Sequence, residues 1–158
     1  MFFADTQNKL LFAVTKKTAA ELIVERADAT KPNMALTTWK GSIVRKQDIF
    51  IAKNYLTEDE IDSLNRLVVI FLEMAELRVK SHKDITIQFW QDNVDKILLF
   101  NDRPLLSGKG SISHKNMEIR IRQVYADFDN RRKQYEAQLA DQDDLKIIEN
   151  AIKKVKNR

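Results

Sequence analysis

The stretch TEDEIDSLNRLVVIFLEMAELRVK, residues 57–80, decides the fold class because it joins a helix-start signal to a long helical repeat. Thr57 and Glu60 have the spacing of a capping box, in which the side chain of each residue meets the backbone of the other. Apolar residues then recur at steps of three and four, the period of an amphipathic helix. The residues expected in the core are Leu64, Leu67, Val68 and Phe71. Further apolar residues widen this surface and predict a central helix with several neighbours: Ile70, Leu72 and Leu77.

The composition indicates that the whole chain is helical. Its 158 residues fit one domain, and 44% of them are hydrophobic, which is enough for a sizeable core. Three glycines and two prolines are too few for the many turns of an all-β fold. The absence of cysteine excludes disulfides, thiolate catalysis and cysteine zinc sites. We therefore predict an all-α fold, an irregular bundle of five to seven helices with a long C-terminal helix, forming a single helical domain over residues 1–158.

Start signals and periodicity place further helices on both sides of this stretch. Thr18 and Glu21 repeat the capping-box spacing, and Pro32 predicts a turn just before it. Residues 34–46 should form an irregular loop around Trp39. The predicted helices are Ala4–Val14, Thr18–Ala27, Gln47–Asn54, one from Thr86 through Leu98, Ser113–Leu139 and a short basic helix Asp144–Lys156. Core positions predicted within them include Leu22, Ile23, Phe89, Trp90, Val94, Ile97 and Leu98.

The predicted helix Ser113–Leu139 carries a coiled-coil seam. Its residues follow a 4-3-4-3-4 spacing through Met117, Ile121, Val124, Phe128, Arg131 and Tyr135. Such a helix would be roughly 40 Å long, more than a compact body of this size covers. We expect the end beyond Phe128 to project and to pair with a second copy, which makes the protein a homo-oligomer, most simply a dimer. Arg131 would weaken this pairing or fix its register unless an acid such as Glu136 of the second copy meets it.

Charge and hydropathy limit the classes of partner. A net charge of +4 permits contact with nucleic acid without requiring it, since 23 acidic residues are interspersed with 27 basic ones. Basic clusters at 120–122, 131–133 and 153–158 are either a solvated face or a track for a phosphate backbone. The longest apolar run, 67–72, is too short to cross a bilayer, and the first residues have no signal-peptide pattern. We expect no membrane contact and a cytoplasmic location.

The polar residues after the Thr18 helix form the first candidate site. Arg26, Asp28, Lys31 and Asn33 could read a phosphate or take part in catalysis. They could equally tie down the loop, since Asp and Asn side chains commonly bond to the backbone of turns. The sequence leaves both alternatives open.

A second group of candidates surrounds this cluster. Trp39 stands directly before Lys40 and Gly41, so its indole could stack on a nucleobase or anchor the core. Glu73 and Glu76 share a helix face, so they could bind a divalent cation or form ordinary salt bridges. The remaining members of the candidate set are Asn54 and Arg66.

Motifs for metals, cofactors and common enzymes are missing from the sequence. His82 and His114 are the two histidines, and they stand in unlike settings without a zinc motif. The chain has no P-loop, no GxSxG and no Rossmann glycine pattern. We assign no metal site and no cofactor. An enzyme would have to be built from Lys, Arg, Glu, Asn and Tyr side chains alone.

Six short motifs together resemble the RhuM family of bacterial virulence-associated proteins. They are QNKL at 7–10, TAAELI at 18–23, RADA at 26–29, KPNM at 31–34, LTTWKG at 36–41 and AKNYL at 52–56. Each is weak alone, but the set is specific, and the resemblance runs from Phe3 to about Asn130. The chain has Ala35 where the family tends to have glycine, which argues against a positive φ there.

The resemblance implies a genomic context and does not imply a particular reaction. RhuM-like proteins have no settled biochemical activity and are found in pathogenicity islands, among mobile elements and near type I restriction-modification genes. They usually carry a preceding region that looks like a phage-type DNA-binding domain. We therefore expect this chain to correspond to the C-terminal half of such a protein, with nucleic acid a possible partner of the full-length form.

Two functional hypotheses follow. The leading one is a helical interaction and oligomerisation module of a DNA-associated protein. The alternative is a toxin-like enzyme that acts on nucleic acid or nucleotide through the Arg26–Asn33 cluster. Geometry separates them: an open pocket that joins Arg26 and Lys31 to Glu73 or Glu76 would favour the enzyme. Burial, mutual pairing or scatter of these residues would favour the module.

Overall fold

The computed structural model describes residues 2–156, which form α-helices, short 3₁₀ turns and loops, with no strand among them. The α-helices are α1 (Phe2–Thr15), α2 (Ala19–Arg26), α3 (Glu58–Lys80), α4 (Ile87–Phe100) and α5 (His114–Lys156). Three 3₁₀ turns lie between α2 and α3: η1 (Pro32–Ala35), η2 (Asp48–Phe50) and η3 (Ala52–Tyr55). The prediction of an all-α fold with a long C-terminal helix is confirmed.

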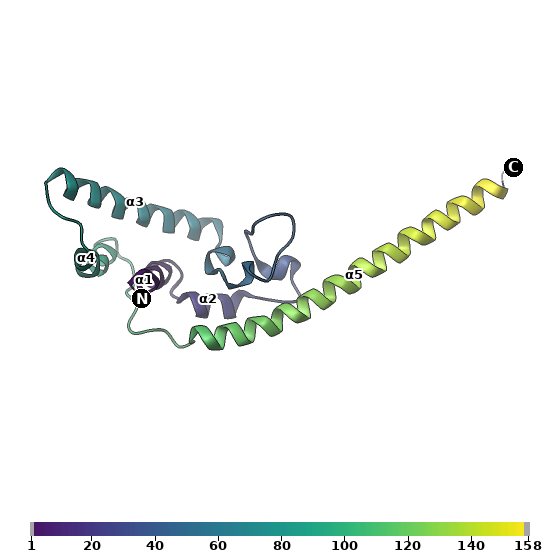
Figure 1. The fold of residues 1–158 in the computed structure, drawn as a ribbon, viewed down its shortest axis with the longest axis horizontal. Coiled ribbons are helices and arrows are strands. Elements are labelled where there is room, and N and C mark those ends of the chain that lie inside the picture. The colour runs from purple at the N-terminus through teal and green to yellow at the C-terminus, as the bar shows by residue number, and fades with distance from the viewer. Residues whose placement is uncertain (1, 157–158) are drawn as a thin grey trace.

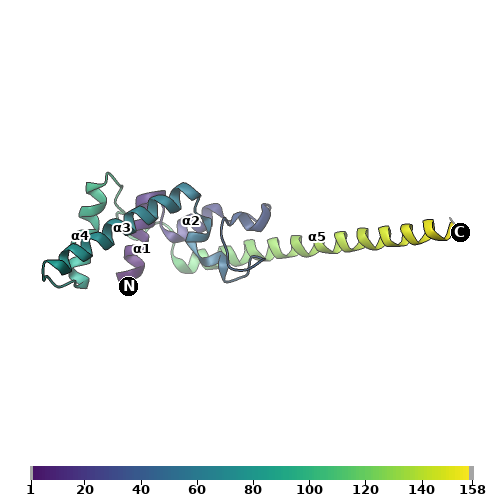
Figure 2. The same ribbon diagram turned by 90° about the horizontal axis from the view of Figure 1, so that it is seen from above.

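The helices form a body at one end of the molecule, from which α5 extends as a single continuous rod that curves gently in Figure 1 (Figures 1 and 2). In the body, α2 packs on the first part of α5, and α1 packs on α3 and α4. The chain between α2 and α3 folds into a compact set of turns beside α5, where η2 contacts it. The body therefore covers only the first part of α5 and leaves the rest outside.

Two apolar clusters make up the core. The larger joins α2 and α5 to the turn region and includes Leu22, Ile23, Met34, Ile49, Tyr55, Met117 and Ile121. The smaller joins α1, α3 and α4 and consists of Ala13, Leu67, Phe71, Val94 and Leu98. Leu22, Ile23, Val94 and Leu98 are buried as predicted, while Phe89, Trp90 and Ile97 are partly buried. The helical period thus identified most of the core positions in α2 and α4.

The prediction that α3 is a central helix is wrong. Leu67 and Phe71 are buried and Leu64 is partly buried, but Val68 is 39% exposed. Further apolar residues of α3 are also exposed: Val69, Ile70, Leu72, Leu77 and Val79. The reason is that α3 lies at the edge of the body and packs mainly on α1, so only one stripe of the helix is covered.

The predicted break between Leu139 and Asp144 is also absent, because α5 continues without interruption to Lys156. Residues 139–144 contain neither glycine nor proline, so no local signal ends the helix. Its 43 residues correspond to about 65 Å. Phe128 is the last buried residue of α5, and every residue from Lys133 to Asn150 is exposed. The end of the helix beyond Phe128 projects, as predicted from the length of the helix that carries the seam.

The predicted helix Gln47–Asn54 is instead two 3₁₀ turns. They are separated at Ile51, whose backbone is extended, with φ −99° and ψ 105°. The side chain of Tyr55 is buried and donates its hydroxyl hydrogen to the carbonyl of Ile49 at 3.0 Å. Tertiary burial of Ile49 and Tyr55 fixes this conformation, and the sequence period does not show it.

Residues 33–35 adopt a left-handed turn, which corrects the expectation for Ala35. Asn33, Met34 and Ala35 have φ values of 52°, 57° and 62°. Met34 is fully buried, its N–H donates to the carbonyl of Lys31, and the N–H of Leu36 donates to that of Asn33. Burial of Met34 therefore holds Ala35 in a conformation that normally costs an L-residue about 1–2 kcal/mol.

We predict that Ala35→Gly raises the free energy of unfolding by about 0.5–1 kcal/mol. Relief of the left-handed strain outweighs the greater freedom of glycine in the unfolded chain. Ala27→Gly is the matched control, because Ala27 has an ordinary φ of −65° and should lose stability instead. Urea titration of the three proteins measures both effects. Equal destabilisation by the two changes would contradict the left-handed turn.

We predict that Phe71→Ala lowers the free energy of unfolding by about 3–5 kcal/mol, because it opens a cavity between α1, α3 and α4. Phe71 is 8% exposed and its ring centroid lies 5.7 Å from that of Trp90. The neighbouring change Leu72→Ala, at a side chain 58% exposed, should cost less than about 0.5 kcal/mol. A loss below about 1 kcal/mol for Phe71→Ala in urea unfolding would show that this face of α3 is not core.

Candidate functional site

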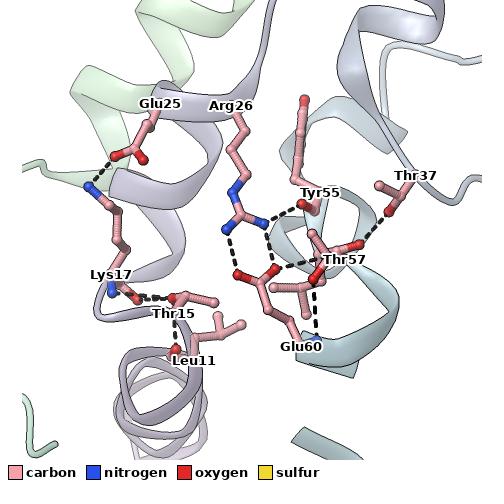
Figure 3. A network of polar contacts seen from close by, with 10 residues as sticks. Leu11, Thr15, Lys17, Glu25, Arg26, Thr37, Tyr55, Thr57 and Glu60 are labelled. Carbon is pink, nitrogen blue, oxygen red and sulfur yellow. Dashed lines mark hydrogen bonds and ion pairs between the residues drawn. The ribbon is translucent and has the colours of Figure 1, made fainter. Parts of the chain in front are cut away.

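Arg26 lies between the end of α2 and the start of α3, where it makes structural contacts (Figure 3). Its guanidinium donates to both carboxylate oxygens of Glu60 at 2.6 Å and to the carbonyl of Tyr55 at 2.7 Å. Glu60 also accepts the N–H of Thr57 at 2.9 Å, and its own N–H donates to the Thr57 hydroxyl, which is the predicted capping box of α3. The hydrogen bond from Arg26 holds the pKa of Glu60 below its usual value. Arg26 thus joins two helix ends, and its charge is matched within the fold.

The other residues of the Arg26–Asn33 cluster do not gather around this pair. The carboxylate of Asp28 accepts the N–H of Thr30 at 2.8 Å and its hydroxyl at 2.7 Å. Hydrogen bonds from Thr30 lower the pKa of Asp28, which therefore fixes its own turn. Lys31 and Asn33 are exposed; Asn33 is part of the left-handed turn, and Lys31 lies just before it in an extended conformation. The cluster that the sequence placed together is divided among separate local contacts.

Asn54 holds the base of the loop that contains Trp39 and Lys40. Its side-chain amide donates to the carbonyl of Asp48 at 2.9 Å, and its own carbonyl accepts the N–H of Thr37 at 2.7 Å. Trp39 is partly buried against the larger apolar cluster, while Lys40 is exposed. These contacts give Asn54 and Trp39 roles in positioning the loop.

The candidates on α3 lie far from the Arg26 pair. Arg66 donates to Asp62 at 2.7 Å on the exposed face. Glu73 and Glu76 are exposed further along the helix, beside a shallow depression that also includes Leu77. Thirteen residues of helix separate Glu60 from Glu73, which is about 20 Å at 1.5 Å per residue. Arg26 therefore shares no pocket with Glu73 or Glu76.

Sequence reasoning missed a contact between α2 and the start of α5. Glu21 Oε2 accepts the N–H and the hydroxyl hydrogen of Thr18 at 2.8 and 2.9 Å, and Oε1 accepts those of Ser111 at 2.6 and 2.7 Å. Of the two contacts of the predicted capping box, the one from the backbone N–H of Thr18 to the carboxylate of Glu21 is well formed. The Thr18 hydroxyl donates to Glu21 and makes no side-chain cap hydrogen bond to the helix backbone. We call these three residues the Glu21 clasp.

The Glu21 clasp has two physical consequences. Hydrogen bonds from Ser111 and Thr18 lower the pKa of Glu21 from 4.5 to about 2. Gly110, with φ 81°, approaches so closely that an added Cβ would lie 2.7 Å from Thr18 Cγ2. The TxxE spacing signals Thr18 and Glu21, but no local pattern points to Ser111, which is 90 residues away from Glu21.

Comparison with known families gives a match over most of the chain. A family model matches residues 1–136, and its description is virulence protein RhuM family. The chain belongs to this family. No curated protein and no solved structure is significantly similar to it.

The RhuM match covers the body and ends within the projecting part of α5. The Glu21 clasp, the Arg26–Glu60 pair and the loop held by Asn54 all lie inside the matched residues. Residues 137–156 of α5 lie beyond the match. The RhuM match therefore gives no information on that segment.

A groove of about 860 Å³ lies between α1, α4 and the starts of α2 and α5 of this RhuM protein. Some of its polar groups are used within the fold. Lys9 pairs with Asp95 at 2.8 Å, and Asn8 accepts the N–H of Ala19 at 3.0 Å. Among residues 2–156, no three His, Cys, Asp or Glu side chains are placed to hold a metal ion. No described helix is long and apolar enough to cross a membrane.

The projecting part of α5, residues 129–156, is the most conspicuous feature without a covering element; we call it the arm. Its apolar side chains are 42–62% exposed: Tyr135, Leu139, Leu145, Ile148 and Ile152, with Ile147 more exposed still. Exposed apolar side chains also lie on α3, which has as many as the arm, and on α4, where Phe100 is 89% exposed. Contiguous apolar surface of this kind commonly marks a contact with another protein.

We predict that Glu21→Gln lowers the free energy of unfolding by about 1–2 kcal/mol at pH 7, a value reduced for the partial exposure of the group. Because the folded pKa of Glu21 is about 2, below its ordinary 4.5, its contribution is complete above about pH 4.5 and is lost as the pH falls toward 2. The stability difference between the two proteins should shrink over that range.

Thermal or urea unfolding at pH 2.5, 3.5, 4.5 and 7 measures this difference. Glu73→Gln is the surface control, because Glu73 is exposed in mid-helix, and it should change stability by less than about 0.5 kcal/mol at pH 7. A difference between wild type and Glu21→Gln that stays constant down to pH 2.5 would contradict the Glu21 clasp.

Proposed function

We propose that this RhuM-family domain is a helical interaction and oligomerisation module whose binding element is the arm. The observation that carries the proposal is the run of exposed residues from Lys133 to Asn150 on a helix that continues without a break. Isolated helices are only marginally stable in water, and most helical stability in proteins comes from packing of an apolar face. An arm with several half-exposed apolar side chains therefore gains stability from a partner.

The distribution of the polar candidates supports a module over an enzyme. Arg26 is matched by Glu60, Asp28 caps its own turn, and Glu73 lies about 20 Å along α3 from Glu60. A reaction centre needs its groups to converge on one point that substrate can reach. Since these groups are dispersed and engaged locally, none of their contacts favours a toxin-like enzyme acting on nucleotide or nucleic acid.

The body and the arm have different parts in this proposal. The body fixes the direction of α5 through the Glu21 clasp and the apolar contacts of Met117 and Ile121. The arm then presents its seam to a second copy, as the heptad spacing of α5 predicts. In a longer RhuM-like protein, such pairing would bring two DNA-binding regions together in the cytoplasm, in the setting of mobile elements and virulence that the family implies.

We predict that the protein associates through the arm. Light scattering at several concentrations should give a mass that rises above the 18.4 kDa of one chain. Tyr135→Asp should return it to that of one chain, because the change places a charge on the seam. Ala140→Asp, on the opposite side of the helix, is the control and should leave association unchanged. A mass of one chain at all concentrations, unaffected by Tyr135→Asp, would contradict the proposal.

A further inference from the structure

The buried seam of α5 continues into the arm with the same heptad spacing. In the body it consists of Met117, Ile121 and Val124, which pack in the larger apolar cluster. From Phe128 onward the spacing is 3-4-3-4-3-4-3, through Phe128, Arg131, Tyr135, Gln138, Gln142, Leu145, Glu149 and Ile152. A sustained heptad on a straight helix is the pattern of a left-handed coiled coil. The arm therefore presents a defined line of side chains to a partner.

The seam residues of the arm are chemically complementary to the same residues taken in the reverse order, as in an antiparallel pair of arms. About a centre at residue 140, Gln138 faces Gln142, Tyr135 faces Leu145 and Arg131 faces Glu149. Each layer thus joins amide to amide, apolar to apolar, or cation to carboxylate. The outermost layer would join Phe128 to Ile152, again apolar to apolar.

From this pattern we propose that two copies of the chain pair their arms as an antiparallel two-stranded coiled coil, with a two-fold axis at residue 140. The proposal rests on the proposed function and specifies the partner, a second copy, and the register. In this arrangement each seam residue of one helix faces the seam residue of the other helix that lies equally far on the opposite side of residue 140. The contact is isologous, so each complementary layer occurs twice.

A parallel pair would lack this complementarity. In register, it would set Arg131 against Arg131 of the second copy and Glu149 against Glu149. Like charges on a seam are unfavourable, whereas a cation and a carboxylate there fix orientation and register. Antiparallel helices also set opposite ends of their dipoles side by side. The two charged residues of the seam therefore select the antiparallel arrangement.

The side chains that flank the seam agree with the same register. Leu139 would meet its own copy across the two-fold axis, and Ile148 would lie beside Gln134, which covers two of the exposed apolar residues of the arm. Two cations of the arm have partners along the helix: Arg132 with Asp129, and Lys146 with Asp143. Neither pair involves Arg131 or Glu149, whose layers face the second copy.

The body sets the limits of the overlap. Phe128 is the last residue of the seam that the body covers, so a second helix has access to the seam from Arg131 outward. In the proposed register, Glu149 of the second copy lies beside Arg131, and Ile152 reaches the edge of the body at Phe128. The paired segment, 131–149, therefore ends where the seam becomes buried.

One pair opposes the association in this register. Asp141 lies on the flank of the seam one residue from the centre, so it comes close to Asp141 of the second copy. Asp141→Asn should therefore tighten the dimer, by about twofold to tenfold in Kd, because it removes this pair of like charges.

Cysteine cross-linking tests the orientation directly, because the chain has no cysteine of its own. We would prepare Tyr135→Cys and Leu145→Cys as separate proteins, mix them under reducing conditions, and oxidise gently. In the antiparallel register, position 135 of one copy faces position 145 of the other. Either variant alone places its two thiols ten residues apart along the axis, about 15 Å, which is too far for a disulfide. The expected result is a covalent dimer in the mixture and none from either variant alone.

The outcomes separate the register from the proposed function. Covalent dimers from each variant alone would show parallel arms and would overturn the antiparallel register while leaving the module intact. A non-covalent dimer in light scattering without any cross-link would show that the two-fold axis is not at residue 140. A mass of one chain throughout would reject the association itself, and with it the proposed function. Circular dichroism checks that each variant keeps its helix content.

Charge reversal provides an independent test of the Arg131–Glu149 layers. Arg131→Glu and Glu149→Arg should each raise Kd about tenfold or more, because each sets like charges against one another twice. The double variant restores opposite charges and should return Kd to within about threefold of the wild-type value. Failure of the double variant to recover, while both single variants are impaired, would overturn the pairing of these two residues.

Discussion

The fold depends on a carboxylate that joins two segments 90 residues apart. Glu21 stands in the first turn of α2 and accepts four hydrogen bonds, two from Thr18 and two from Ser111. α2 has only eight residues, too few to be stable alone, so it needs contacts at its ends as well as along its face. At its other end Arg26 joins Glu60 and the carbonyl of Tyr55. Hydrogen bonds to charged groups thus hold α2 at both ends.

Once α2 is fixed, the course of α5 follows. Ser111 lies three residues before the start of α5, and Gly110 allows the backbone to approach Thr18 more closely than a side chain would permit. Leu22 and Ile23 of α2 then pack in one cluster with Met117 and Ile121 of α5. Because this cluster covers the seam only as far as Phe128, a continuous seam is divided into a buried part and a longer exposed part. The same heptad thus stabilises the fold in the body and forms a surface for association in the arm.

The polar residues that mark the RhuM motifs act mainly on the backbone around them. Asn54 binds the carbonyl of Asp48 and receives the N–H of Thr37, and Asp28 binds Thr30. The chain between α2 and α3 is rich in turns, including three successive left-handed residues, so it needs side chains that satisfy its backbone groups. This need accounts for a dense polar sequence without a shared reaction centre. It also explains why short motifs from this segment identify the family while giving little information on chemistry.

The sequence by itself determined the helical class, the capping box at Thr57, the burial of Leu67 and Phe71 and the seam of α5, because helix caps and helical periodicity are local properties. Only the tertiary structure decided which apolar residues find a neighbour. Val68 and Leu72 fit the helical pattern of α3 yet are exposed, since α3 lies at the edge of the body. Ala35 takes a positive φ because Met34 is buried, and Glu21 meets Ser111 because the helices pack as they do. Contacts between residues far apart in the chain depend on the whole arrangement, so no local spacing reveals them.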